Sequence, residues 1–325
     1  MRQQGTSLRI GTRGSALAVW QTERVRALLR EVGYETERVE IRTTGDLTPN
    51  LPLVRIGSRA IFTKQIDDAL LEGRIDLAVH SLKDLPTELP AGLTIAAVSP
   101  REDPRDALVG RGPLRWDELP QGATIATSSL RRRAQILNLR PDLRVVDIRG
   151  NVDTRLAKLD ARPEWAGTVL ATAGLVRLGL GQRIGERLPP EIMLPAPGQG
   201  ALAVTTRADD IRVRDAVRGA VHDKTTSIAV AAERAFLRRL EGGCQVPVAA
   251  LARREDAAVH TLTLRGRVVS LNGDLVVSGQ EAGPDESEVE AEALGTRLAE
   301  RLLAEGGAAI LTEIRSTVVP ALTEP

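Results

Sequence analysis

Short apolar runs rich in β-branched residues alternate with longer amphipathic stretches along most of the chain. The first run, LRIGT (8–12), precedes a stretch at 15–33 in which apolar residues recur at helical spacing, with Ser15 as its N-cap. Further strands are predicted at 39–43, 75–79, 123–127, 144–148 and 168–172, and helices at 63–73, 129–139, 151–160 and 173–179. This βαβ alternation predicts an α/β fold with mostly parallel sheets flanked by helices.

Two segments rich in proline, SPREDPR (99–105) and LPAPGQGALAV (194–204), interrupt the alternation and predict crossings between domains. We therefore expect two α/β domains around a cleft, made of residues 1–99 with 200–219 and of residues 100–199. The tail has another pattern, because two strand-like runs flank Asn272-Gly273, a hairpin signal, between predicted helices at 227–240 and 285–305. Residues 220–325 are therefore predicted to form a smaller α+β domain.

The composition of the chain narrows the class of protein. Of its 325 residues, 42% are hydrophobic and 27% charged, which is typical of a soluble globular protein. There is one cysteine, no apolar signal core near the N-terminus and no run near the roughly 20 residues that span a bilayer, so we expect a cytoplasmic protein without a membrane partner. The net charge of +1 and the 2% of aromatic residues argue against a nucleic-acid partner.

Polar and cationic residues follow the predicted strands. Ligands of open α/β sheets bind outside the carboxyl ends of the strands, so these positions are the candidate site. Strand by strand, they are Arg13 and Ser15; Lys83 and Asp84; Thr127, Ser128, Ser129, Arg131 and Arg132; Arg149 and Arg155; and Arg177.

Arginines are concentrated between residues 131 and 155, a stretch that contains seven arginines and only three aspartates. Arg133, Arg140 and Arg144 fit a solvated face. Arginines at the starts of helices oppose the helix dipole unless an anion is bound there, and a guanidinium fork suits carboxylates. The pattern predicts a cleft for a polyanionic ligand, with carboxylates as its anionic groups.

Asp84 and Cys244 each have two interpretations. Asp84 fits a salt bridge to Lys83 or a turn cap before Pro86, and it equally fits a charge that stabilises a cationic intermediate or a carboxyl group that shuttles protons. Cys244, in RRLEGGCQVP, fits a small buried hydrophobe, although its glycine and proline neighbours indicate a loop that displays a functional group. Three histidines and one cysteine show no metal-ligand spacing, so no metal is expected.

Eight stretches, in order and over nearly the whole chain, resemble the porphobilinogen deaminase (hydroxymethylbilane synthase) family: RIGTRGSALA, DLAVHSLKDLP, REDPRDALV, TSSLRRRAQ, RGNVDTRLAKL, ATAGLVRLG, LPAPGQGALAV and RLEGGCQVP. The resemblance implies three domains, the first two like a periplasmic binding protein. It implies an enzyme of tetrapyrrole (heme-type) biosynthesis that condenses four porphobilinogens head to tail, releasing ammonia, to give linear hydroxymethylbilane. The implied cofactor is a dipyrromethane held by a thioether.

The same resemblance implies roles for single residues. Cys244 would carry the cofactor and Asp84 would be the catalytic carboxylate. Cofactor-binding positions would be Ser15, Lys83, Thr127, Ser129, Arg131 and Arg132, and substrate-binding positions Arg13, Ser128, Arg149, Arg155, Arg177 and Gln199. The implied partners are porphobilinogen and the growing polypyrrole chain, with the enzyme a monomer.

One region departs from the family's pattern. Residues 44–61 form a long predicted loop that suits an active-site lid, and its end reads GSRAIFTKQ where the family shows a GKGLFTKE-like sequence. Ala60 thus replaces a glycine and Gln65 a glutamate, which bears on turnover rather than on the reaction. The rival interpretation is a non-catalytic periplasmic-type module that binds a polyanion, and such a module needs neither Cys244 nor Asp84.

Overall fold

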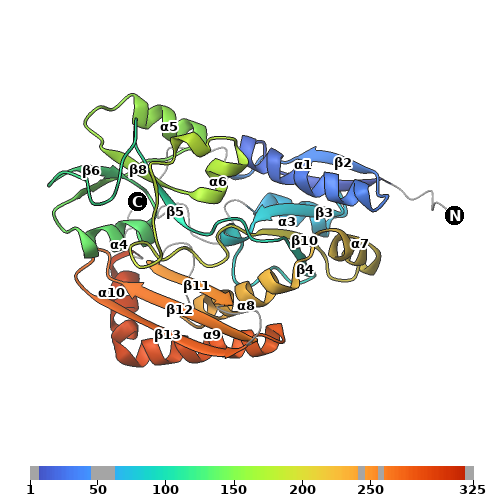
Figure 1. Cartoon of the computed structure of the whole chain (residues 1–325). Coiled ribbons are helices and arrows are strands. Elements are labelled where there is room, and N and C mark those ends of the chain that lie inside the picture. The colour runs from blue at the N-terminus through green and yellow to red at the C-terminus, as the bar shows by residue number, and fades with distance from the viewer. Residues whose placement is uncertain (1–6, 45–62, 241–245, 255–259, 319–325) are drawn as a thin grey trace. The chain divides into compact units, whose positions relative to one another are not determined.

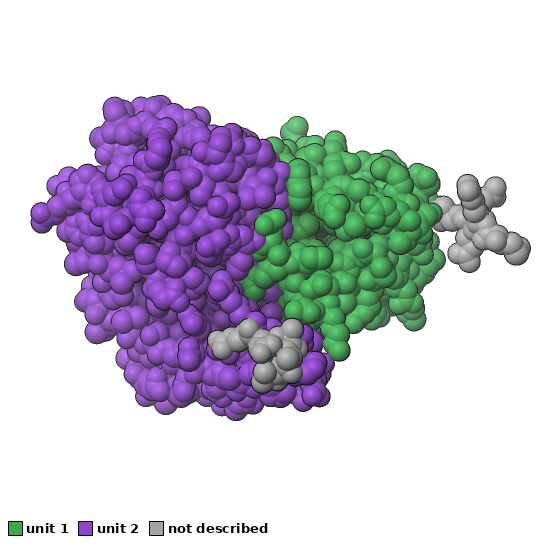
Figure 2. All heavy atoms as spheres, in the orientation of Figure 1, with its two compact units in different colours: residues 1–49, 59–102, 201–227 green, residues 50–58, 103–200, 228–325 purple. Residues whose placement is uncertain are grey.

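The computed structural model of the chain describes residues 7–44, 63–240, 246–254 and 260–318. These residues divide into two compact units (Figure 2). Unit 1 holds the described parts of 1–49, 59–102 and 201–227, and unit 2 those of 103–200 and 228–325. The further division of unit 2 into domains 100–199 and 220–325 stays a prediction. Among the described residues, no helix has the length and apolar character needed to cross a membrane.

Unit 1 is built on one mixed five-stranded sheet with the order β2-β1-β3-β10-β4 (Figure 1). β1 is parallel to β2 and β3, whereas β10 is antiparallel to β3 and β4. The strands are β1 (Leu8–Thr12), β2 (Thr36–Glu40), β3 (Leu77–Ser81), β4 (Leu93–Val98) and β10 (Leu202–Arg207), and a 3₁₀ turn, η2 (Leu82–Asp84), follows β3.

Helices cover both faces of this sheet: α1 (Ala16–Glu31) and α7 (Ile211–Val221) one face, α3 (Lys64–Leu71) the other. Leu77 packs in the cluster that holds residues of α1 and α7, and Ala78 packs in the cluster that holds residues of α3. Successive residues of a strand point to opposite faces, so the sheet is buried between two helical layers.

The first part of unit 2 repeats this architecture with the sheet order β7-β6-β8-β5-β9. β6 is parallel to β7 and β8, and β5 is antiparallel to β8 and β9. The strands are β5 (Asp106–Val109), β6 (Thr124–Ala126), β7 (Arg144–Val146), β8 (Gly167–Ala171) and β9 (Glu186–Arg187); the helices are α4 (Leu130–Leu139), α5 (Val152–Asp160), α6 (Thr172–Arg177) and the 3₁₀ turn η3 (Gly181–Arg183). Ala107 packs with α5 and α6, and Leu108 packs with α4, so helices again cover both faces.

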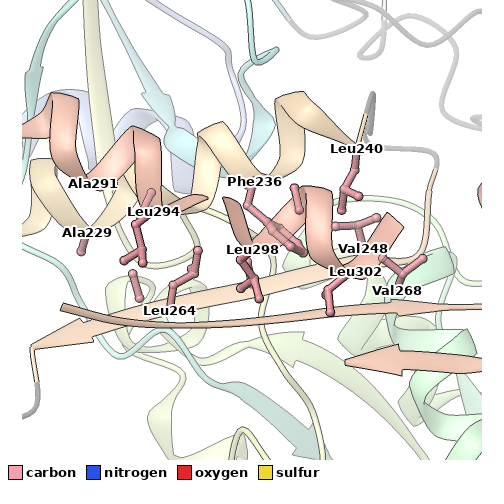
Figure 3. Close-up of a cluster of buried hydrophobic side chains, with 14 of the residues drawn as sticks. Ala229, Phe236, Leu240, Val248, Leu264, Val268, Ala291, Leu294, Leu298 and Leu302 are labelled. Carbon is pink, nitrogen blue, oxygen red and sulfur yellow. The ribbon is translucent and has the colours of Figure 1, made fainter. Parts of the chain in front are cut away.

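The C-terminal part of unit 2 is an antiparallel three-stranded sheet, β11-β12-β13, packed against helices. Its elements are α8 (Lys224–Arg239), which enters unit 2 at Ile228, β11 (Val248–Arg254), β12 (Thr261–Val269), β13 (Val276–Pro284), α9 (Glu288–Leu302), a π-helical turn η4 (Leu303–Gly307) and α10 (Ala308–Val318). Phe236, Leu264 and Leu298 lie in one buried cluster between α8, β12 and α9 (Figure 3). A Cβ at Gly266 would lie 2.5 Å from the Phe236 ring, so this close approach requires glycine.

The architecture confirms the predicted α/β fold with a smaller α+β part at the C-terminus, and the Asn272-Gly273 turn joins β12 to β13 as expected. Two predicted strands are displaced. The strand predicted at 39–43 is β2 at Thr36–Glu40, and the one predicted at 75–79 is β3 at Leu77–Ser81. Thr63 occupies the N-cap position of α3 as predicted, but its side chain makes no capping hydrogen bond.

Candidate active site

In unit 1, four predicted site residues lie at one edge of the sheet. Ile10 and Gly11 of β1 pair in parallel with Leu77 and Ala78 of β3, so the carboxyl ends of both strands meet at the same edge. Arg13 and Ser15 follow β1, whereas Lys83 and Asp84 belong to η2, directly after β3. The Ser15 hydroxyl accepts a hydrogen bond from the Ala18 N–H at 3.3 Å and so caps α1.

The Asp84 side chain is exposed at the end of η2. In the part of the chain that the structure describes, no ion pair joins it to Lys83 and no capping hydrogen bond engages it. The turn is instead held by the backbone: the Leu82 N–H donates to the Ala201 carbonyl at 3.0 Å, and the Leu85 N–H donates to the Leu82 carbonyl at 3.1 Å. The two structural interpretations of Asp84 are therefore not realised among the described residues.

Side chains beneath this edge fix the end of β3. Gln21, buried on α1, donates from Nε2 to the Ser81 hydroxyl at 2.8 Å. His80 is buried, with Nε2 lying 3.1 Å from the Thr205 hydroxyl. Burial, reinforced by the charge of Arg13, lowers the pKa of His80 to about 4. A neutral imidazole therefore underlies the segment that carries Asp84 near neutral pH.

In unit 2, the loops after β6, β7 and β8 also meet at one edge, because β6 is parallel to both neighbours. The Ser128 hydroxyl donates to the Ile148 carbonyl at 2.9 Å and accepts from the Ile148 N–H at 3.0 Å, which ties the first two loops together. The Thr127 hydroxyl accepts from the Ser129 N–H at 3.2 Å, and Ser129 caps α4 by accepting from the Arg132 N–H at 3.5 Å. These hydroxyls already shape the loop.

Arg131 and Arg132 are buried and share one buried carboxylate, Asp106 at the start of β5. Arg131 donates to Oδ2 at 2.7 Å, and Arg132 donates to Oδ1 at 2.7 and 3.1 Å. Gln199 also donates to Oδ1, at 3.0 Å. Burial alone would raise the pKa of Asp106, but the two guanidinium groups hold it well below its ordinary value. The carboxylate is therefore ionised at any physiological pH.

The remaining predicted arginines of unit 2 lie at the same edge in more open positions, apart from Arg177. Arg149 is half-buried, and this burial lowers its pKa. Arg155 donates from Nε to the Gly150 carbonyl at 2.7 Å, and buried Arg177 donates to the Gly200 carbonyl at 2.6 Å. Two other arginines support the fold: Arg133 donates to the Val145 carbonyl at 3.3 Å, and Arg140 pairs with Asp142 at 2.7 Å.

Cys244 and Ala60 lie outside the described residues, as does nearly all of the predicted 44–61 loop. Gln65, the other departure from the family pattern, is described. Its side-chain amide donates to the Thr44 hydroxyl at 2.7 Å and accepts from the Thr44 N–H at 3.2 Å. A glutamate at this position could accept both bonds but could not donate, so the amide suits this contact.

Two family models match the chain. Residues 8–215 match "Porphobilinogen deaminase, dipyromethane cofactor binding domain", and residues 227–304 match "Porphobilinogen deaminase, C-terminal domain". A porphobilinogen deaminase from Rubrobacter xylanophilus is 53% identical over 94% of this chain and 97% of its own length, and one from Syntrophotalea carbinolica is 48% identical over 97% and 98%. The chain belongs to the porphobilinogen deaminase family.

The predicted membership of the porphobilinogen deaminase family is thus confirmed, and with it the predicted enzyme class and the dipyrromethane cofactor. The rival interpretation, a non-catalytic binding module, is not favoured. All predicted site residues except Cys244 lie within the range matched by the cofactor-binding domain, and Cys244 lies within the range matched by the C-terminal domain. A solved YaeC-family lipoprotein from Enterococcus faecalis is similar over 69% of this chain and 94% of its own, with a TM-score of 0.42 and 16% identity.

No role is predicted for Asp106 from the sequence, although its stretch REDPRDALV contributes to the resemblance. Its signal is a carboxylate that directly precedes the apolar run ALV of a buried strand. Buried carboxylates require cationic or hydrogen-bonding partners, so this position predicts buried arginines nearby.

Proposed function

We propose that the chain condenses four porphobilinogens head to tail into linear hydroxymethylbilane, with Cys244 as the thioether anchor of the dipyrromethane and Asp84 as the catalytic carboxylate. The observation that carries the role of Asp84 is its position: an exposed carboxylate, without a partner among the described residues, at a sheet edge otherwise lined by Arg13 and Lys83.

Asp84 would act on the charge that develops during deamination. When the amine of porphobilinogen leaves as ammonia, positive charge remains on the pyrrole and its methylene carbon. A carboxylate already held beside that charge stabilises the transition state without reorganisation, which is the largest single contribution in many enzymes. The backbone bonds that fix η2 and the Gln21–Ser81 contact below it hold Asp84 in place for this role.

The described cations fit a ligand that carries many carboxylates. Every pyrrole unit carries an acetate and a propionate, so each addition brings two negative charges. Arg13 and Lys83 in unit 1, and Arg149 and Arg155 in unit 2, follow strand ends and suit these groups. When bound, the dipyrromethane supplies the pyrrole to which the first substrate is joined and keeps the growing product on the enzyme.

We further propose that the enzyme is a monomer of the cytoplasm and binds no membrane or nucleic acid. A net charge of +1 and a 2% aromatic content support the last part, because nucleic-acid sites require basic patches and stacking platforms. Light scattering of the purified chain tests the first part, with a mass near 34.9 kDa expected for a monomer.

Intact-mass spectrometry tests the anchor. The wild-type chain is expected to exceed its sequence mass by two pyrrole units, whereas Cys244→Ser is expected to fold, carry no adduct and lack activity. Because the chain has one cysteine, the variant removes its only thiol. An Arg144→Ala control, altered at an exposed strand residue, should carry the normal adduct. The normal adduct on Cys244→Ser would refute the assignment.

A further inference from the structure

Asp106 divides its two oxygens between two guanidinium groups. Oδ2 accepts from Nη1 of Arg131 at 2.7 Å, and the same Nη1 also donates to the Leu194 carbonyl at 2.7 Å. Oδ1 accepts from Nε and Nη2 of Arg132 at 3.1 and 2.7 Å. The carboxylate is fully buried, and each arginine side chain is 7% exposed. One acid therefore fixes the orientation of two nearly buried guanidinium groups.

This arrangement leaves a different edge of each guanidinium available. A guanidinium has five N–H donors. Both N–H groups of Nη1 of Arg131 already donate, one to Asp106 and one to the Leu194 carbonyl. Its Nε and Nη2 donors, which form one bidentate edge, have no partner among the described residues. Arg132 donates to Asp106 from Nε and from Nη2, so the two N–H groups of Nη1 and the second N–H of Nη2 have no described partner.

The charges of the cluster point to an anion. Two buried guanidinium groups face one buried carboxylate, and no second carboxylate pairs with either arginine in the described part of the chain. Gln199 also donates from Nε2 to Oδ1 of Asp106 at 3.0 Å, but it is neutral and adds no charge. Buried charges are ordinarily matched and fully hydrogen-bonded, because an unmatched buried charge is strongly unfavourable. A cluster with one excess positive charge and two open donor edges is built to receive a carboxylate.

We propose that Asp106 is a positioning residue that orients Arg131 and Arg132 so that their open edges bind carboxylates of the covalently held dipyrromethane. This inference rests on the proposed function and deepens it. Asp106 acts through the arginines, because it is fully buried and four donors already contact its carboxylate. A cluster that only supported the fold would balance its charge, because an unmatched buried charge is strongly unfavourable.

The test is Asp106→Asn, with Asp142→Asn as its matched control. Asp142 also pairs with an arginine of unit 2 at 2.7 Å, but it touches neither Arg131 nor Arg132. Each apo chain is incubated with porphobilinogen, and intact mass follows the gain of two pyrrole units. Asp106→Asn is expected to load about tenfold more slowly than wild type, or slower still, whereas Asp142→Asn loads normally.

The melting temperature separates positioning from stability. If Asp106 merely holds the fold, Asp106→Asn lowers the melting temperatures of the apo and loaded chains equally. If Asp106 positions the arginines for the cofactor, the gain in melting temperature on loading shrinks. Normal loading with an undiminished gain would overturn the inference.

Asp106→Glu keeps the inference testable if Asp106→Asn does not fold. It preserves the charge but displaces both guanidinium groups by one methylene. We expect slower loading and a smaller gain in melting temperature, and wild-type values of both would overturn the inference. Failure of the proposed function has another signature, since the wild-type chain would then gain no dipyrromethane mass at all.

Discussion

Asp84 and Asp106 are two carboxylates near candidate cations, yet their surroundings are opposite. Asp84 is exposed on a 3₁₀ turn of unit 1 and has no partner among the described residues. Asp106 is fully buried in unit 2, and two arginines and a glutamine donate to it. The same side chain thus orients two arginines in one unit and is left unpaired by the described residues in the other.

The difference separates residues that bind the ligand from the residue that acts on the reacting atoms. A charge that binds carboxylates is most effective when its direction is fixed in advance, and Asp106 fixes Arg131 and Arg132 in this way. A charge that stabilises a developing cation must not be neutralised beforehand by a neighbouring arginine or lysine. In the proposed mechanism, Asp84 meets this requirement because no described residue pairs with it.

The comparison predicts a large effect on stability at Asp106 and almost none at Asp84 for the same substitution. Asp106→Asn removes the one carboxylate that pairs with two buried arginines in the described part of the chain, and it is expected to cost about 3–5 kcal/mol in the free energy of unfolding. Asp84→Asn should change it by no more than about 0.5 kcal/mol, because the side chain is exposed and unpaired in the described structure. Urea unfolding of the apo chains measures both. A large loss of stability in Asp84→Asn would show that this aspartate is structural.

Arg149→Ala tests whether the half-buried arginines of unit 2 bind carboxylates. Loss of one charge-assisted contact is expected to cost about 1.5–3 kcal/mol in the binding of porphobilinogen or in elongation, with little effect on folding. The control is Arg144→Ala, since Arg144 is exposed on β7. Arg140 is unsuitable as a control because it pairs with Asp142 and donates to the Leu119 carbonyl. Equal damage by Arg144→Ala would contradict the assignment.

Asp67 provides a third environment, buried but unpaired. Burial raises its pKa to about 6 from 3.8, against the opposing effect of the nearby Thr63 side chain. Neither carboxylate oxygen has a partner within hydrogen-bond geometry among the described residues. An acid whose pKa is raised by folding contributes stability below its unfolded pKa, and this stability is lost as pH rises through about 6. Asp67→Asn is therefore expected to be more stable than wild type at pH 8, by roughly 1–2 kcal/mol, and nearly equal at pH 4.

Thermal unfolding as a function of pH measures this effect of Asp67. If the difference between Asp67→Asn and wild type were the same at pH 4 and pH 8, titration of Asp67 would not be its source. Asp68→Asn, altered at the exposed partner of Lys64 on the same helix, is the control and should show no such rise.

Much of the fold was predictable because buried strands carry continuous apolar runs. β1 and β8 were predicted to within one residue, since their runs are enclosed by helices on both faces. β2 was misplaced because it is an edge strand, TERVE, with mostly polar, exposed side chains. β3 extends to Ser81 because it pairs with β10, which comes more than a hundred residues later and leaves no local signal.

The candidate site was predictable in its positions but not in its pairings. Strand ends located Arg13, Lys83 and Asp84 at one edge, because parallel neighbours share that edge. The partnership of Arg131 and Arg132 with Asp106 depends on β5 lying next to β8, a contact between segments about 60 residues apart in the chain. Such pairings follow from sheet order, which local periodicity does not determine.

Single-turnover ammonia release by cofactor-loaded Asp84→Asn, at saturating porphobilinogen, tests the central claim most directly. The variant keeps the shape of the side chain and removes its charge, so release is expected to slow by about 10²–10³ while dipyrromethane content and melting temperature stay normal. Asp84→Glu, which keeps the charge but displaces it by a methylene, should retain more activity. Near-normal release by loaded Asp84→Asn would contradict the proposed role of Asp84.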